Sequence, residues 1–249
     1  MGIIGGAFGI RLLNYASRHG MSGLPDVATA YVGKSKLETL FGERFWHQIR
    51  GKVVLDFGCG PGAEAVEMAE RGAAQVIGVD LRDLWLEMAQ ARAVEHGVGG
   101  RCRFAREWHE PVDTIVSLDS FEHFADPHAI LRIMADLLKP SGQVLVCFGP
   151  TWYHPLGGHI YSIFPYAHLV FSERALVGWR SLSKNDGART IEESGLNRMT
   201  IRRFENIVAR SPLRFADFEA MPIRKLRWFA GKATREFTTA VVRCRLVPR

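Results

Sequence analysis

The 249-residue sequence lacks any apolar stretch of the roughly 20 residues that a membrane-spanning helix needs. Cysteine is also scarce. The four thiols are far apart, form no CxxC pair and lie in or beside apolar runs, where thiols usually pack as small hydrophobic groups. They are Cys59, Cys102, Cys147 and Cys244. We therefore expect reduced cysteines and a cytoplasmic protein. The N-terminal segment has neither a basic leader nor a long apolar core, so we expect no secretory signal.

Internal repeats and low-complexity linkers are absent as well. Hydrophobic residues make up 47% of the chain and charged residues 23%, which excludes intrinsic disorder and collagen-like or disulfide-rich classes. Because a single core can grow to about 250 residues before a chain divides, we expect one domain over residues 1–249.

Positive charge is present but unevenly distributed. The net charge is +6, yet the segment from Arg198 to Arg249 holds thirteen Lys or Arg against four Asp or Glu. Such a segment is a solvated face, or it attracts an anionic membrane surface or nucleic acid. Basic and apolar residues alternate from Arg224 to Phe229, which favours an amphipathic face over a nucleic-acid arm. We rank the solvated face first, peripheral membrane contact second and nucleic acid last.

Strand-like and helix-like segments alternate from residue 52 to residue 148. β-branched runs predict five strands, and helical spacing of apolar residues predicts three helices between them. The strands are 52–57, 75–80, 101–105, 112–118 and 143–148, and the helices are 63–71, 83–96 and 127–138. Asp126 is the expected N-cap of the third helix, and residues 139–142 are an expected turn. This alternation predicts an α/β fold, a mostly parallel sheet covered on both faces.

The flanking regions are less regular. Residues 1–50 are expected to supply a helical cap over the binding edge of the sheet, and residues 51–150 the core. Residues 151–200 are interpreted as a substrate-side insertion, with helices at 172–179 and 189–194. Residues 201–249 are interpreted as basic C-terminal strands, with strand candidates at 204–209 and 236–247.

The strongest motif is the glycine turn after the first strand. Val54-Leu-Asp-Phe-Gly-Cys-Gly-Pro-Gly62 is a buried strand that enters a turn opening a helix. Glycines let a ligand lie against bare backbone, close to the N–H groups of the helix. Dinucleotide binding would favour GxGxxG, whereas the spacing here is GxGxG after Asp56. A carboxylate there suits the cationic amino group and sulfonium of S-adenosylmethionine.

Two further elements follow the next strands. Asp80, with Leu81 after it, ends the second strand about 20 residues after the turn, where a carboxylate can accept both hydrogen bonds of a ribose diol. The alternatives for Asp80 are a helix N-cap and NAD binding. After the third strand, the carboxylate of Glu107 could meet an adenine amine while Trp108 packs on the ring. The alternative for this pair is an ordinary surface loop.

In combination, these segments resemble the motifs of class I S-adenosylmethionine-dependent methyltransferases. Asp56–Gly62, Val79-Asp80 and the segment from Asp113 to His123 resemble the first, second and fourth motifs, and residues 137–143 resemble the helix-to-strand turn of the family. The resemblance covers about residues 50–150 and is nearest to the small-molecule type 11/12 group. It implies a Rossmann-like, doubly wound, seven-stranded sheet with S-adenosyl-L-methionine as cofactor and S-adenosyl-L-homocysteine as product.

The resemblance also implies residue roles. The first motif wraps the methionine part of the cofactor, Asp80 holds the ribose, and the end of the fourth strand borders the sulfonium. The residues concerned are Asp56, Gly58, Cys59, Gly60, Gly62, Asp80, Leu81, Leu118, Asp119 and Ser120. The segment from Tyr31 to Lys34 is similar to the entry helix of the family, so Tyr31 joins the cofactor-binding set. One departure is the short stretch between Glu107 and Val112, where the family often has a longer loop with an Asp at the adenine.

Methyl transfer depends mainly on holding the acceptor atom close to the methyl carbon. A hydroxyl acceptor also benefits from a general base, for which histidine is the usual choice near neutral pH. Three histidines are candidates: His123 after the fourth strand, and His154 and His159 in the insertion. The alternatives are a hydrogen-bonding residue that orders its loop for His123, and structural loop histidines for the other two. Aromatic side chains of the insertion could wall an apolar acceptor pocket or pack as a lid.

No metal ligand set is expected, because the nine histidines form no HxxxH pair with carboxylates nearby. The favoured function is transfer of a methyl group to a small apolar or aromatic acceptor, with oxygen favoured, by a monomer or homodimer. The alternatives are a cofactor-binding or membrane-associated accessory protein, a nucleic-acid methyltransferase and a nicotinamide-dependent dehydrogenase. The fourth strand ends in Leu118-Asp-Ser-Phe121 and carries neither an Asn/Asp-Pro-Pro-Tyr/Phe nor a Pro-Cys motif, which disfavours nucleic acid.

Overall fold

The computed structural model describes residues 2–19, 33–184 and 186–249. Tyr31, one of the expected cofactor-binding residues, lies outside these described residues. Within them, no helix has both the length and the apolar character needed to cross a membrane.

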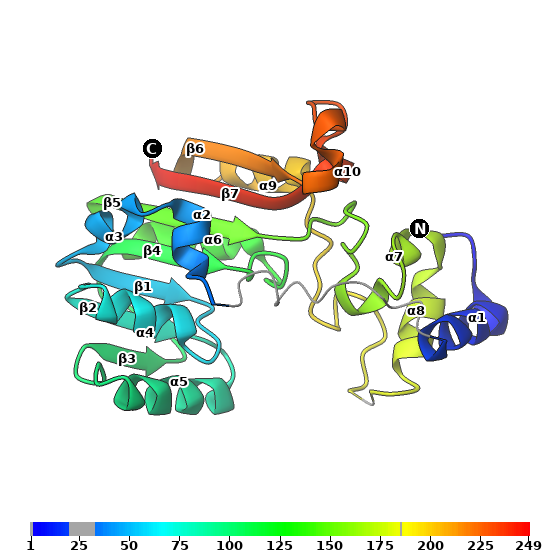
Figure 1. Ribbon diagram of the computed structural model, residues 1–249, viewed down its shortest axis with the longest axis horizontal. Coiled ribbons are helices and arrows are strands. Elements are labelled where there is room, and N and C mark those ends of the chain that lie inside the picture. The colour runs from blue at the N-terminus through cyan, green and yellow to red at the C-terminus, as the bar shows by residue number, and fades with distance from the viewer. Residues whose placement is uncertain (1, 20–32, 185) are drawn as a thin grey trace.

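A seven-stranded sheet forms the centre of the larger lobe (Figure 1). Its strands lie in the order β3-β2-β1-β4-β5-β7-β6. Pairing is parallel from β3 to β5, and β7 runs antiparallel to both β5 and β6. The strands are β1 (Val53–Phe57), β2 (Gln75–Val79), β3 (Cys102–Ala105), β4 (Val112–Leu118), β5 (Leu138–Phe148), β6 (Leu213–Pro222) and β7 (Thr239–Pro248). The expected seven-stranded, mostly parallel sheet is confirmed.

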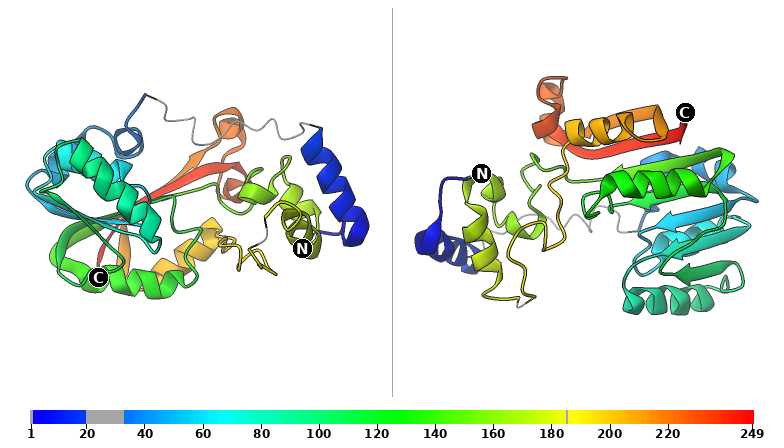
Figure 2. Two further views of the ribbon diagram at one scale, coloured as in Figure 1. Left: turned by 90° about the horizontal axis from the view of Figure 1, so that it is seen from below. Right: turned by 180° about the vertical axis from the view of Figure 1, so that it is seen from behind.

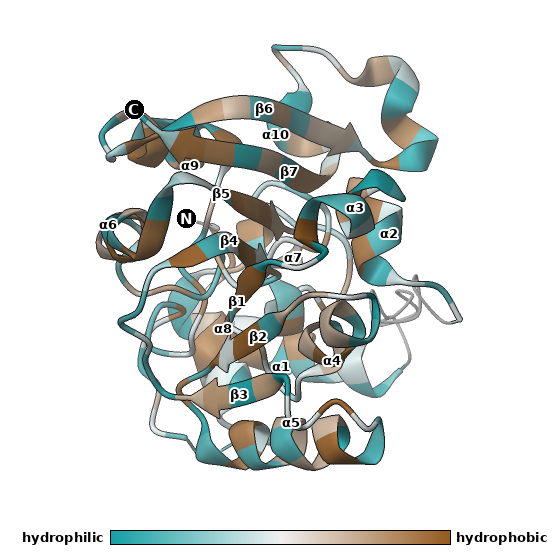
Figure 3. Ribbon diagram, turned by 90° about the vertical axis from the view of Figure 1, so that its left-hand side faces the viewer, coloured by the Kyte–Doolittle hydropathy of each residue, from teal (hydrophilic) through white to brown (hydrophobic). Residues whose placement is uncertain are grey.

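Helices cover both faces of the sheet, because the central strands are apolar on both sides. One buried cluster joins the sheet to α2 (Lys36–Phe41), α3 (Arg44–Ile49), α4 (Ala63–Glu70) and α5 (Asp83–Glu95). A second cluster joins the opposite face to α6 (Pro127–Leu137) and α9 (Ile201–Ala209). Figure 2 shows the two helix layers on opposite sides of the sheet. In Figure 3, hydrophobic strands lie between helices whose outer faces are hydrophilic.

A smaller helical lobe is built from two distant parts of the chain. Helix α1 (Gly6–Arg18) packs against α8 (Glu173–Arg180), and α7 (Ala167–Val170) and the 3-10 helix η2 (His159–Tyr161) complete the lobe. The expectation that residues 1–50 form one cap over the sheet edge therefore needs correction. Among the described helices of this region, α2 and α3 pack on the sheet, whereas α1 buries its apolar stripe of Gly9, Leu13 and Ala16 against the insertion.

Most predicted elements in the core are confirmed within two residues, including the N-cap of α6, where Asp126 accepts hydrogen bonds from the N–H groups of His128 and Ala129. The expected turn at 139–142 is instead a bulge within β5. There, one residue of β4 between Val112 and Thr114 faces four residues of β5 between Leu138 and Gln143. The four cysteines are free and buried, as expected.

Three expectations for the C-terminal half were wrong. Residues 204–209 lie in the helix α9, and residues 189–194 form an irregular loop and turn rather than a helix. Strand β6 was missed, and the last strand begins at Thr239 because residues 235–238 form the short helix α10 (Arg235–Thr238). The short run Phe204–Ala209 is compatible with the apolar spacing of a strand or of a helix. The segment begins at Ile201 and has Thr200 as its N-cap, and both features indicate a helix.

Candidate functional site

The order of strands reverses between β1 and β4, so the crevice beyond their carboxyl ends is the expected ligand site of such a sheet. The turn after β1 and the turn after β4 meet at this point. The sequence-predicted first and fourth motifs are therefore neighbours in space, although about 60 residues separate them in the chain.

The glycine turn is held in a shape that would strain a residue with a side chain. Gly58 and Gly62 have φ angles of +87° and +78°, in the left-handed region that favours glycine. A Cβ at Gly62 would approach the Cβ of Ala89 to 2.6 Å, and one at Gly60 would approach the ring of Trp85 to 2.8 Å. The N–H groups of Gly58 and Cys59 both donate to the carbonyl of Val79, which ties the turn to the end of β2.

Asp80 braces this turn from the second strand. Its Oδ2 accepts a hydrogen bond from the N–H of Gly60 at 3.1 Å, and its Oδ1 accepts one from the N–H of Arg82 at 3.0 Å. The guanidinium of Arg82 lies 3.2 Å from the ring centroid of Trp85. A carboxylate oxygen can accept more than one bond, so Asp80 keeps acceptor capacity for a ligand. The Leu81 side chain is largely exposed.

Acidic side chains gather around one lysine at the crevice. Nζ of Lys36, at the start of α2, lies 2.6 Å from Oδ2 of Asp119 and 3.7 Å from Oε1 of Glu64. The Asp56 carboxyl is buried, and its Oδ2 has no hydrogen-bond partner among the described residues. Burial and the charge of Glu64 raise the pKa of Asp56 well above its usual range. The crevice is therefore a place where a cation gains stability.

Glu107 and Trp108 follow β3 but differ in their surroundings. The carboxylate of Glu107 is exposed and lies 3.6 Å from the ring nitrogen of His109. Trp108 is partly buried against the core, and its Nε1 is buried without an acceptor among the described residues. Their contact with an adenine ring stays a prediction.

The turn after β4 is anchored by buried side chains and hydrogen bonds. Leu118 is buried, Ser120 Oγ donates to the Leu118 carbonyl at 2.8 Å, and Asp119 adopts a φ of +46° that non-glycine residues seldom show. Glu122 is buried, and its Oε1 accepts from the N–H of Gly149 at 3.3 Å. Burial and the charge of Asp119 raise the pKa of Glu122 to about 8.

Asn197 fixes the next residues of the same loop. Its Nδ2 donates to the carbonyls of Phe121 and Phe124, and its backbone N–H donates to the carbonyl of Glu122. His123, which is exposed, makes a 2.6 Å hydrogen bond from Nδ1 to the carbonyl of Gly195. His123 therefore makes the kind of hydrogen bond that we expected if it orders the loop rather than acts as a general base.

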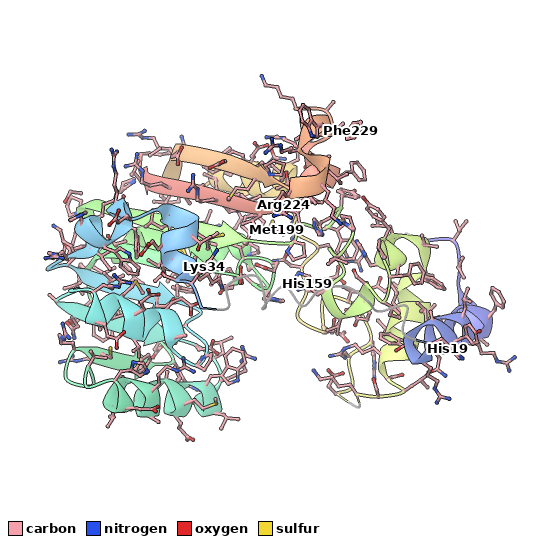
Figure 4. The ribbon with its side chains drawn as sticks, in the orientation of Figure 1. His19, Lys34, His159, Met199, Arg224 and Phe229 are labelled. Atoms are coloured by element: carbon pink, nitrogen blue, oxygen red, sulfur yellow. The ribbon has the colours of Figure 1, made fainter. Side chains whose placement is uncertain are left out.

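His159 lies at the junction of the two lobes (Figure 4). Its ring packs edge-on against that of His123, with centroids 5.4 Å apart. Nε2 is buried and has no hydrogen-bond partner among the described residues. Burial and the nearby His123 lower the pKa of His159 to about 4, which keeps the imidazole neutral near pH 7 and leaves one ring nitrogen as an acceptor. The structure brings His123 and His159 together near Asp119, whose charge acts on the pKa of His159.

His154 is placed differently. Its Nδ1 accepts a hydrogen bond from the N–H of Leu156 at 2.9 Å, so that nitrogen is used within its own turn. Burial lowers the pKa of His154 to about 4 as well. Nearby, His168 is buried between Ser162 Oγ and the Trp152 carbonyl.

Three site residues were missed from the sequence. They are Lys36, Trp85 and Asn197, which hold the acidic crevice, the glycine turn and the loop after β4. Trp85 carried a usable signal, since it lies five residues after Asp80 in the first turn of a predicted helix. Lys36 and Asn197 lie far from the motifs in sequence, so only the fold reveals them. Over the described residues, no group of His, Cys, Asp and Glu is arranged to hold a metal ion.

Comparison with known proteins gives a family match. The model of a methyltransferase domain family matches residues 32–197, about two thirds of the chain. A ubiquinone biosynthesis O-methyltransferase of Idiomarina loihiensis is 35% identical over 156 residues, covering 60% of each chain. One of Neisseria meningitidis is 33% identical over 158 residues, covering 61% of this chain and 62% of the relative. The match thus spans about 60% of the length of these curated relatives.

Solved structures share the fold. An S-adenosylmethionine-dependent methyltransferase of Mesorhizobium loti superimposes with a TM-score of 0.54 at 19% identity, covering 81% of this chain and 93% of that one. A geranyl diphosphate C-methyltransferase of Streptomyces coelicolor gives a TM-score of 0.56 at 15% identity, covering 82% of this chain and 72% of that one. At these identities the likeness concerns the architecture alone.

Proposed function

This chain belongs to the methyltransferase domain family, and from that premise we propose that it is an S-adenosylmethionine-dependent enzyme that methylates a hydroxyl group of a small apolar or aromatic molecule. The similarity to curated O-methyltransferases supports oxygen as the acceptor atom. The observation that carries the choice is His159, a buried neutral imidazole with an unpartnered Nε2.

The residues of the crevice fit the cofactor. The orphaned, buried Oδ2 of Asp56 and the surrounding carboxylates suit a ligand that carries an ammonium and a sulfonium. We assign the methionine part to Asp56, Gly58, Cys59, Gly60 and Gly62, and the ribose to Asp80. Leu118 and Asp119 would border the sulfonium, which supplies the methyl group when the cofactor is bound.

The side chains of this protein have three tasks in the reaction. The packed glycine turn and the loop clamped by Asn197 hold their positions before binding, which lowers the entropy cost of aligning the two reactants. Trp152 and Phe164 pack against the core of the helical lobe, and we assign the aromatic side chains of this lobe to the acceptor side. His159 accepts the hydroxyl proton as the oxygen becomes a nucleophile.

The test is methyl transfer from labelled S-adenosylmethionine to a panel of aromatic hydroxyl compounds, each paired with its methyl ether as a blocked control. We expect label only in the hydroxyl members. His159→Ala should lower kcat by about 100-fold or more, the usual contribution of a general base, while the Kd for S-adenosylhomocysteine is unchanged. His154→Ala is the matched control and should keep most of the activity. Full turnover by His159→Ala would remove it as the base.

A further inference from the structure

The connection between β6 and β7 projects from the antiparallel edge of the sheet (Figure 1). It comprises residues 223–234, here called the basic excursion, and includes the 3-10 helix η3 (Arg224–Phe229), in which no residue is buried. Figure 4 shows Phe229 near its outer end. The excursion lies on two strands that belong to neither the glycine turn nor the loop after β4, so it is separate from the site described above.

Two adjacent aromatic side chains are exposed at the tip of this excursion. Trp228 is 85% exposed and Phe229 is 71% exposed. Large aromatic rings contribute stability chiefly when they are removed from water, so a neighbouring pair in solvent marks a surface that is covered in the working state.

Charge on the same segment has one sign. The excursion, residues 223–234, contains four basic side chains and no acidic one, and Arg235 follows it. Arg235 is paired with Glu205, whereas no described carboxylate forms an ion pair with Arg224, Lys225, Arg227 or Lys232. The excursion therefore carries four cations together with the two exposed rings, and Arg227 lies 5.7 Å from the ring centroid of Trp228. These cations complement an anionic partner.

We propose that the basic excursion docks the protein on the surface of an anionic lipid bilayer. Tryptophan and other aromatic rings favour the boundary between headgroups and acyl chains, and Lys and Arg beside them gain from the negative surface potential. A short protruding segment with adjacent rings suits shallow insertion into this boundary. A single nucleic-acid strand is instead usually bound along a groove with spaced aromatic platforms. The proposal does not depend on the identity of the methyl acceptor.

The experiment is sedimentation of the full chain with vesicles, without cofactor or acceptor, so that its result is independent of methyl transfer. One set of vesicles is phosphatidylcholine alone and the other contains phosphatidylglycerol as well. We expect binding to the anionic vesicles only, with an affinity that falls steeply as salt is raised. The double variant Trp228→Ser, Phe229→Ser and the double variant Lys225→Gln, Arg227→Gln should each lose at least about tenfold in affinity.

Phe8→Ser is the matched control, because Phe8 is 70% exposed but lies on α1, in the other lobe. This variant should bind the anionic vesicles as the wild type does. Unchanged circular dichroism and thermal unfolding would show that the excursion variants fold. Absence of wild-type binding to anionic vesicles would overturn the proposal, as would a loss that follows Phe8 and spares the excursion. Binding of an oligonucleotide or self-association that is abolished by the excursion variants, with vesicle binding unchanged, would also overturn it.

Discussion

At the scale of single residues, Asp80 joins two roles. It ties the glycine turn to the end of β2 through Gly60, and it is our proposed acceptor for the ribose hydroxyls. The alternative prediction for this carboxylate, an N-cap of the next helix, is wrong, because α5 has no side-chain cap bond and Asp80 instead accepts a hydrogen bond from the N–H of Arg82.

Asp80→Ala should weaken binding of S-adenosylmethionine by more than about tenfold, because hydrogen bonds to a charged acceptor are each worth about 1.5–3 kcal/mol. Isothermal titration measures the change. Asp83→Ala removes an exposed carboxylate three residues along the chain and is the control. Equal affinities for the wild type and Asp80→Ala would reject the ribose assignment.

The raised pKa of Glu122 predicts how the stability of the protein depends on pH. Its pKa is raised to about 8 by burial, so between about pH 4.5 and 8 the folded protein holds a proton that the unfolded chain has released. The wild type therefore loses stability from this group as pH rises through that window. Glutamine at position 122 cannot ionise, so Glu122→Gln does not lose stability in this way. Across this window, the free energy of unfolding of Glu122→Gln should rise relative to that of the wild type by up to about 1.4 kcal/mol per pH unit.

Chemical denaturation at several pH values measures this difference, with the exposed Glu107→Gln as control. A Glu122→Gln curve parallel to that of the wild type from pH 5 to pH 8 would mean that Glu122 is ionised in the folded protein.

At the scale of elements, the insertion is held by a buried histidine. In our assignment, His168 donates from Nε2 to the Trp152 carbonyl at 2.7 Å and accepts at Nδ1 from Ser162 Oγ at 3.0 Å. The Ser162 oxygen in turn accepts from the N–H of Gly158, next to His159. This chain of bonds joins α7 to η2 and so supports the proposed base.

Burial lowers the pKa of His168 to about 4, so from about pH 6.5 down to pH 4 the unfolded chain binds a proton that the folded protein does not. Stability from this group is present above that window and is lost as pH falls through it. His168→Gln should make the dependence of unfolding free energy on pH shallower there, by up to about 1.4 kcal/mol per pH unit. The exposed His109→Gln should leave the slope unchanged, and an unchanged slope in His168→Gln would place a proton on the folded histidine.

The elements also show what sequence patterns can and cannot specify. Strands β1 to β4 and helix α5 were predictable because alternation and glycine boundaries mark them locally. Strand β6 was not, since it pairs only with β7 at the edge of the sheet and most of its residues are not buried, which leaves a weak apolar pattern. The packing of α1 on α8 depends on contacts about 160 residues apart, and no local pattern encodes these.

At the scale of the whole molecule, the α/β lobe carries the proposed cofactor residues, and the helical lobe carries His159 and the aromatic insertion. Local motifs marked the loops of the first set, because a strand, a glycine turn and a helix lie together in sequence, and the cofactor roles of these residues stay a prediction. The pairing of His159 with His123 and the position of Lys36 in the acidic crevice depend on the tertiary structure. In our proposal, acceptor specificity belongs to this junction.

The most direct test of the central claim is calorimetric titration of the purified protein with S-adenosylmethionine, S-adenosylhomocysteine and NADH in parallel. The proposed fit of the crevice predicts micromolar binding of the two adenosyl ligands and no binding of NADH. Binding of NADH, or no binding of either adenosyl ligand, would contradict the assignment of Asp56, Asp80 and the glycine turn as a methyltransferase cofactor site.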